Sequence, residues 1–223
     1  MGMSSNPLTP LASLSHPLPI VLAALLAGWL SPYPGRVAAE GIAPQPAKGK
    51  LLVAARSLSD PNFDQTVVLL LDYSSEGALG LVVNRPTEMK LSLLLPDAEG
   101  IGDRVDIVYD GGPVLPGAMV MLLRTDEELD ETREILAGVL ATPSREILEQ
   151  RLAQGFPADR LRVYFGHAGW GPGQLDAEIA RHDWLILSGD ADTVFDASPS
   201  EVWPRLIRRE SDRLVSLYDV WTF

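Results

Sequence analysis

The amino-acid sequence predicts a single α+β (mixed α/β) domain. Short apolar runs rich in β-branched residues, which are typical of strands, dominate the first half of the chain. Segments with helix-start signals appear mostly in the second half, and strands followed by interleaved helices and strands are typical of this class. The 223 residues, of which 46% are hydrophobic and 22% are charged, are enough to bury one sizeable core.

The first strands are predicted at residues 51–54, 66–72 and 78–83, where apolar and β-branched residues follow one another. Residues 73–77 have turn chemistry, so the second and third of these strands are expected to form a hairpin. The two runs of this hairpin are apolar at nearly every position rather than at alternate positions. This pattern indicates strands that are buried on both faces.

Two further strands are predicted at residues 105–109 and 118–123. The signals Gly111-Gly112-Pro113 and Pro116-Gly117 are typical of turns and are expected to separate them. Later apolar runs at residues 184–187 and 215–220 predict the last two strands.

The helices are predicted from their start and stop signals. Thr142 and Pro143 are a typical cap and first position, the apolar face follows at residues 147, 148 and 152, and Gly155 ends this helix. A second helix is predicted from Pro172 to about residue 182. The third begins at Ser198-Pro199-Ser200-Glu201, which combines a cap, a proline at the first position and a glutamate at the third.

Residues 1–39 are predicted to be a signal peptide. The apolar run at residues 17–30 is shorter than the roughly 20 residues that span a membrane, and Val37-Ala38-Ala39 suits cleavage after Ala39. We therefore expect a periplasmic protein without a stable transmembrane span, although residues 1–16 contain no lysine or arginine. The alternatives are an uncleaved anchor, and a start codon assigned too early, which predicts a cytoplasmic protein. Residues 40–48, rich in proline and alanine, are expected to be a tether to a domain at residues 49–223.

Composition and charge argue against several classes of function. The chain has no cysteine and therefore no disulfide, thiolate metal site or cysteine nucleophile. Its net charge of −12 argues against general nucleic-acid binding, which requires a basic surface. The three histidines lack the spacing of metal ligands, and no serine lies in a nucleophile motif. We therefore predict no metal, no cofactor and no catalytic residue.

The most informative segment is the glycine-rich stretch at residues 166–173. The alternation of Leu161, Val163 and Phe165 predicts a strand before it, so a strand is expected to end in a loop that opens a helix. Backbone N–H groups at such a place can bind an anion or a partner's backbone, while the other interpretation is a rigid corner. The candidate ligand-binding or partner-binding residues of this stretch are Gly166, His167, Gly169, Trp170, Gly171 and Gln174.

A second candidate site is Asn84-Arg85, directly before Pro86. This tripeptide is typical of a turn. The planar guanidinium of Arg85 can also clamp a carboxylate or phosphate at the end of a strand. If Arg85 and the glycine-rich stretch meet in space, they form an anion pocket.

Several segments along the chain form an ordered set of motifs: Lys50-Leu51-Leu52-Val53-Ala54-Ala55, Asp60-Pro61-Asn62-Phe63, residues 66–70, residues 76–86, Gly111-Gly112-Pro113-Val114, residues 166–179, and Phe195 followed by Trp203. Taken in this order, these segments resemble the YqgE/AlgH family of bacterial proteins. The resemblance implies a compact, partly barrel-like β-sheet flanked by helices, and it adds Gly111 and Gly112 to the candidate binding residues. The family has no settled biochemical activity, so the resemblance predicts the fold better than the function.

We predict a non-enzymatic protein that binds a protein partner or a small anionic ligand in a regulatory or envelope-associated role. One alternative is a nucleotide-binding or phosphate-binding protein, or an enzyme, that uses the stretch at residues 166–173. The other alternative is a cytoplasmic transcriptional regulator, which requires that the leader be a wrongly assigned start.

Overall fold

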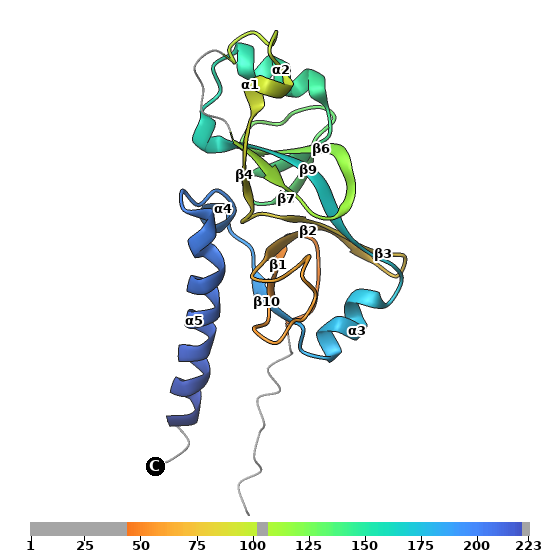
Figure 1. The fold of residues 1–223 in the computed structure, drawn as a ribbon, viewed down its shortest axis with the longest axis vertical. Coiled ribbons are helices and arrows are strands. Elements are labelled where there is room, and N and C mark those ends of the chain that lie inside the picture. Colours follow the sequence, from red (N-terminus) through yellow and green to blue (C-terminus); the bar gives the residue numbers. More distant parts are fainter. Residues whose placement is uncertain (1–43, 102–106, 220–223) are drawn as a thin grey trace, which may run out of the picture. The chain divides into compact units, whose positions relative to one another are not determined.

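The computed structural model describes residues 44–101 and 107–219, which are shown in Figure 1. The strands are β1 (Lys50–Ala54), β2 (Val67–Ser74), β3 (Gly77–Val82), β4 (Pro86–Lys90), β5 (Ile107–Asp110), β6 (Val114–Arg124), β7 (Arg133–Leu136), β8 (Val139–Thr142), β9 (Leu161–Trp170) and β10 (Trp184–Ser188). The helices are α1 (Leu91–Leu94), α2 (Arg145–Ala153), the 3₁₀ turn η1 (Ala158–Arg160), α3 (Gln174–Ala180), α4 (Ala191–Val194) and α5 (Pro199–Asp219).

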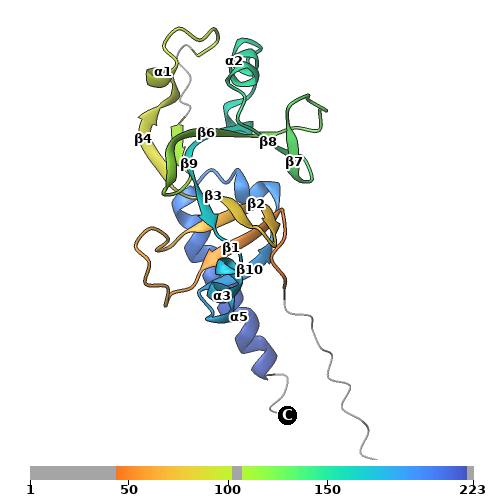
Figure 2. The same cartoon turned by 90° about the vertical axis from the view of Figure 1, so that its right-hand side faces the viewer.

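The sheet is curved into an open half-barrel (Figure 2). Hydrogen-bonded neighbours follow the order β10-β1-β2-β3-β9-β6-β8-β7, and β5 joins β9 to β4. The pairing of β5 with β9 is parallel, whereas the other described pairings are antiparallel. The α+β class and the partly barrel-like sheet flanked by helices are therefore confirmed.

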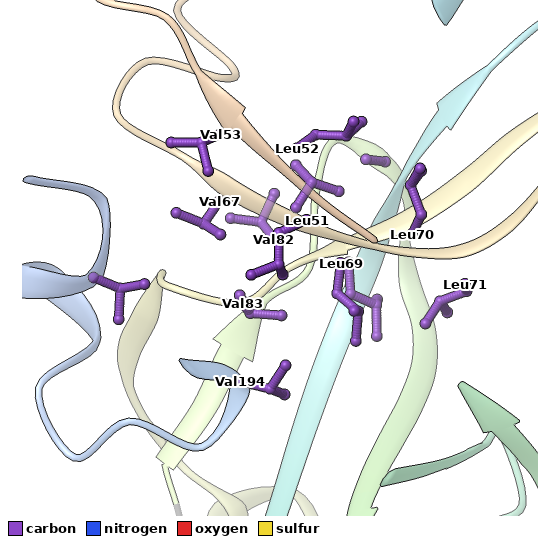
Figure 3. Close-up of a cluster of buried hydrophobic side chains, with 14 of the residues drawn as sticks. Leu51, Leu52, Val53, Val67, Leu69, Leu70, Leu71, Val82, Val83 and Val194 are labelled. Carbon is purple, nitrogen blue, oxygen red and sulfur yellow. The ribbon is translucent and has the colours of Figure 1, made fainter. Parts of the chain in front are cut away.

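The larger core is built on the hairpin of β2 and β3 and on β1, which the sequence predicted (Figure 3). Residues 67–70 of β2 are fully buried at successive positions, which confirms burial on both faces for this strand, whereas β3 is buried only at residues 80–82. Helix α5 covers this core with Val202, Leu206 and Ile207, and Trp203 donates from Nε1 to the carbonyl oxygen of Ala54 at 2.8 Å.

A second, smaller core lies on the other face of β6 and β9. Val163 of β9 packs in the smaller core and Tyr164 packs in the larger one, because successive side chains of a strand point to opposite faces. Leu148 and Leu152 of α2 close the smaller core. The strands β6 and β9 therefore form a wall between the two cores.

Two predictions about the centre of the sheet are wrong. Strand β9 does not end at Phe165 but continues to Trp170, so only residues 171–173 form the turn before α3. Strand β6 runs through the predicted break at Pro116-Gly117, where its pairing with β9 shifts and residues 115–118 bulge out. Glycine and proline are read as turn signals, but they also occur at bulges and where two backbones approach closely, and local sequence does not distinguish these cases.

Two helix boundaries also differ from the prediction. Helix α2 begins after Ser144, whose Oγ accepts a hydrogen bond from the N–H of Ile147 at 3.4 Å, whereas Thr142 ends β8. The predicted last strand at residues 215–220 is wrong, because residues 215–219 extend α5 and residue 220 lies outside the described residues. A helix that is already established adds further residues at little cost, which outweighs the local strand propensity.

The remaining strand predictions hold with small shifts. Strand β5 lies at Ile107–Asp110, while the predicted residues 105 and 106 lie outside the described residues. Strands β4, β7 and β8 were not predicted, because they are four or five residues long and two of them carry charged side chains. The predicted signal peptide and residues 40–43 of the tether lie outside the described residues, and Pro46 of the tether is buried.

Candidate functional site

The glycines of the predicted sites allow two backbones to cross at close range. A Cβ atom on Gly166 would lie 2.2 Å from the carbonyl oxygen of Gly112, and one on Gly111 would lie 2.3 Å from the carbonyl oxygen of Gly166. A Cβ atom on Gly112 would lie 2.5 Å from the carbonyl carbon of His167. No side chain fits at these three positions, so the glycines serve the packing of the β5–β6 connection against β9.

The end of the stretch joins an aromatic cluster rather than an open loop. The indole N–H groups of Trp170 and Trp184 both donate to Glu178 Oε2, at 2.8 Å and 2.9 Å, and Gln174 Nε2 donates to Glu178 Oε1 at 3.0 Å. The ring of Phe63 stacks on Trp170 with centroids 5.9 Å apart. Trp170 and Gln174 thereby position α3 on the sheet.

Asn84 and Arg85 hold the loop that precedes β2. Asn84 accepts from the N–H of Val67 at 2.8 Å and donates to the carbonyl oxygen of Gln65 at 2.9 Å. The Arg85 guanidinium donates to the carbonyl oxygens of residues 62 and 64, at 2.6 Å and 3.2 Å. These contacts use two of the five guanidinium N–H donors of Arg85, and they hold the guanidinium against the loop at residues 62–64.

The last three candidates lie on the outer side of β9 and just beyond its end. His167 is half-buried and pairs in register with Val114. Gly169 is exposed, and a Cβ atom on it would lie 3.6 Å from the Val114 side chain, which is an ordinary contact. Gly171 has open space around it, and its N–H donates to Gln174 Oε1 at 3.2 Å. Of the predicted candidates, His167 and Gly169 therefore lie beside Val114, just before the bulge of β6, and Gly166 lies against Pro116 within the bulge, where a Cβ atom on Gly166 would be 3.4 Å from the Pro116 Cα.

A cleft of 290 Å³ lies next to this bulge. Strand β4, helix α1, strand β5, the bulge and the middle of β9 all contribute to its wall. The lining residues are Thr87, Met89, Leu94, Val108, Tyr109, Asp110, Pro116 and Phe165.

The rim of this cleft carries exposed apolar side chains. Within the described residues, the large apolar side chains that are exposed are Met89, Leu93, Leu94, Val114 and Leu115. Met89 and Leu94 line the cleft, Leu93 and Leu115 are next in sequence to the lining residues Leu94 and Pro116, and Val114 precedes Leu115. We call these five residues the apolar rim. Isolated exposed apolar residues are ordinary, but a cluster around one cleft is typical of an interaction site.

The bulge presents Leu115 under backbone strain. Leu115 has a φ of +47°, in the left-handed region that branched side chains avoid, and its side chain is 65% exposed. Such a conformation costs on the order of 1 kcal/mol and persists only where the surroundings impose it. Here the pairing of Val114 with His167 on one side and of Met119 with Phe165 on the other imposes it.

The polar groups of the cleft are few, and most of their hydrogen bonds are internal. Asp110 Oδ1 accepts from the N–H of Gly112 at 3.0 Å, and Thr87 Oγ1 donates to the carbonyl oxygen of Val108 at 2.7 Å. Burial raises the pKa of the Tyr109 hydroxyl, although the neighbouring charge of Arg162 acts in the opposite direction. The cleft is therefore suited to an apolar group of a ligand, and the carboxylate of Asp110 is the acidic group in its lining.

Behind the cleft, Arg162 joins separate parts of the fold. Its guanidinium lies 4.6 Å from the ring centroid of Tyr109 and donates to the carbonyl oxygens of Val83 and Asp196. Only 7% of Arg162 is exposed. A buried guanidinium is tolerated because aromatic faces and carbonyl oxygens replace its hydration.

Sequence reasoning missed the lining residues of the cleft and its apolar rim. One signal was available, because Val114-Leu115 stands between Pro113 and Pro116-Gly117, where turn chemistry places two apolar side chains at a surface. Thr87, Leu94 and Phe165 carried no such signal. In the part of the chain that the structure describes, no group of three or more metal-ligating side chains is found, and no helix is long and apolar enough to cross a membrane.

The half-barrel sheet, its flanking helices and the bulged β6 together define a class of α+β proteins. The chain belongs to the AlgH-like family, whose sequence pattern matches residues 51–214. A UPF0301 protein of Streptomyces avermitilis is 36% identical over 171 residues, which are 74% of this chain and 88% of that protein. A UPF0301 protein of Xanthomonas euvesicatoria is 35% identical over 182 residues, which are 80% of this chain and 96% of that protein. The predicted family is therefore confirmed.

Two solved structures are similar to this one. The AlgH protein from Pseudomonas aeruginosa matches with a TM-score of 0.60 and 32% identity, over 73% of this chain and 87% of that chain. A protein from Corynebacterium diphtheriae matches with a TM-score of 0.64 over 75% of this chain and 88% of that chain, at 23% identity. The second likeness supports the fold alone.

Proposed function

We propose that this protein is a non-enzymatic binding protein whose cleft beside the β6 bulge receives an apolar side chain of a protein partner. The observation that carries the proposal is the apolar rim around the cleft. On this acidic surface, the apolar side chains of the rim are exposed to water, and covering them with another surface lowers the free energy.

The size and shape of the cleft favour one anchoring group. Full burial of one leucine or methionine side chain contributes about 1.5–3 kcal/mol, and a few buried side chains carry most of the binding energy of an interface. The strained Leu115 supports the proposal, because strain held in an exposed apolar residue is more often found at functional positions than elsewhere. A regulatory or envelope-associated role is consistent with a protein that acts by binding.

We expect Leu115→Asp to weaken partner binding at least about tenfold without lowering thermal stability, because Leu115 is exposed and a charge at the rim must be desolvated in the complex. The partner is first captured in the native host with a photo-reactive residue at position 115, and the same residue at position 208 on the exposed side of α5 is the control. The captured protein is then purified, and its affinity for the wild-type and Leu115→Asp proteins is measured by calorimetry. Equal cross-linking at both positions, or equal affinity of both proteins, would contradict the proposal.

We also propose that the protein is exported and acts outside the cytoplasm, on the basis of the signal-like layout of residues 1–39. The intact mass of the chain purified from the periplasmic fraction of the native host is expected to correspond to a chain that begins at Glu40. An Ala39→Arg variant should keep the leader, because signal peptidase requires a small residue there. A chain retaining residues 1–39 in the cytoplasmic fraction would count against export and favour a cytoplasmic binding role.

A further inference from the structure

Strand β10 forms one edge of the sheet, and no strand among the described residues pairs with its outer side. The N–H of Ala55 donates to the carbonyl oxygen of Asp183, the residue opposite it, at 2.9 Å. Hydrogen-bonding direction alternates along an antiparallel strand, so Leu185 and Leu187 also bond to β1. The N–H and C=O groups of residues 184, 186 and 188 therefore point to the open edge.

A groove of 650 Å³ lies beside this edge, between β10 and α5. Its apolar lining includes Leu185 and Leu187 from β10, Ile179 from α3 and Ile207 from α5. Both leucines are half-buried, so they are available to contact a ligand while still packing on the core. Figure 1 shows α5 extending along one side of β10.

Two arginines line the same groove in a chain with a net charge of −12. Arg56 is exposed and lies 5.7 Å above the ring of Trp203. Arg213 lies 3.2 Å from Glu210, the carboxylate of the lining. The charge of the groove is therefore opposite in sign to that of the whole protein, which favours a ligand that carries carboxylates.

We propose that this groove binds an extended apolar segment of a partner protein that ends in acidic residues, and that the segment adds a strand to β10. A strand supplies the N–H and C=O groups that the open edge requires, which a helix cannot do. Alternate side chains of the segment would contact Leu185 and Leu187, and its carboxylates would face Arg56 and Arg213. This surface is separate from the cleft beside the β6 bulge.

A second copy of the chain fits this edge less well. Antiparallel pairing of two β10 strands about Ile186 would set the Trp184 end of one copy, with Arg56 nearby, against the Ser188 end of the other. Lys50 pairs with Ser188 there, with its Nζ 3.3 Å from Ser188 Oγ, so like charges would approach each other.

The test uses the full chain and two pools of fluorescent hexapeptides. In both pools threonine alternates with valine, isoleucine, leucine or phenylalanine, and the last two residues are aspartates in one pool and lysines in the other. Fluorescence polarisation should show that the aspartate pool binds at least about tenfold more tightly. Arg56→Glu should abolish this preference, while Arg208→Glu on the exposed side of α5 is the matched control and should keep it.

Hydrogen exchange with the aspartate pool tests the pairing directly. The amides of Ile186 and Ser188 should exchange fast in the free protein and become protected by the peptides, while the amides of Leu185 and Leu187 are protected in both states. A Ser188→Pro variant removes one outward N–H from an exposed edge position and should bind less tightly. Equal binding of both pools, no binding of either, or outward amides already protected in the free protein would overturn the proposal. Leu115→Asp should leave peptide binding unchanged, so failure here and failure at the cleft are distinguishable.

Discussion

Gly166→Ala is expected to lower the free energy of unfolding by about 3 kcal/mol, because it combines an overpacked contact with a strained backbone. The added Cβ atom would lie 2.2 Å from the carbonyl oxygen of Gly112. Gly166 also has a φ of +73°, which alanine adopts only at a cost. Both atoms at the contact are fixed to buried backbone, so no flexible side chain can move to relieve it. Urea denaturation followed by tryptophan fluorescence measures the effect.

Gly171→Ala is the matched control from the same stretch. A Cβ atom there meets nothing within 4 Å, and Gly171 does not adopt a positive φ, so we expect a change below about 0.5 kcal/mol. A loss of stability at both positions, or at neither, would contradict the packing role assigned to Gly166. The comparison therefore separates a structural use of the glycine-rich stretch from a ligand-binding use, because a ligand cradle would leave the stability of the free protein unchanged.

Arg162→Met is expected to lower the free energy of unfolding by about 3 kcal/mol, because a buried arginine's partners lose a charge-assisted donor and find no replacement. The methionine keeps much of the apolar stem but leaves the carbonyl oxygens of Val83 and Asp196 without the guanidinium. The guanidinium also lies over the rings of Tyr109 and Phe195, at 4.6 Å and 5.7 Å from their centroids. The measurement is again urea denaturation, with thermal unfolding as a second readout.

Arg133→Met provides the control for the loss of an arginine. Arg133 is half-exposed and pairs with Asp72 at 3.0 Å, and exposed ion pairs of this kind contribute about 0–1 kcal/mol. If the two variants lost equal stability, Arg162 would not hold the connection between β3, β9 and the segment before α5. Because Arg162 also supports Tyr109 in the wall of the cleft, its loss should weaken partner binding as well as stability.

The strands β1, β2, β3 and β10 could be predicted from sequence because their apolar side chains are local and continuous. The start of α5 could be predicted because its cap, proline and glutamate act within one turn of the chain. Short strands such as β7 and β8 escaped prediction because pairing with a distant strand, rather than their own composition, stabilises them.

The candidate site also contains features that the sequence predicted and features that only the structure showed. The sequence marked Gly111, Gly112 and Gly166 as candidate site residues. It did not predict that they let two backbones pack closely, because the contact between Gly112 and Gly166 joins residues 54 positions apart along the chain. Arg85 was predicted as a ligand-binding residue, and the structure shows that its guanidinium holds the loop at residues 62–64. The residue types indicated which groups are able to bind a ligand. Only the structure showed which of these groups contact other parts of the protein.

By itself the sequence determined the α+β class, the family and the absence of cysteine chemistry, because composition, periodicity and ordered motifs are properties of the chain alone. Only the tertiary structure decided that residues 166–170 of the glycine-rich stretch belong to a strand, that residues 115–118 bulge out, and that Met89, Leu94 and Pro116 share one cleft. These features depend on which strands become neighbours. Strand pairing is settled by the packing of the whole core, so no local pattern records it.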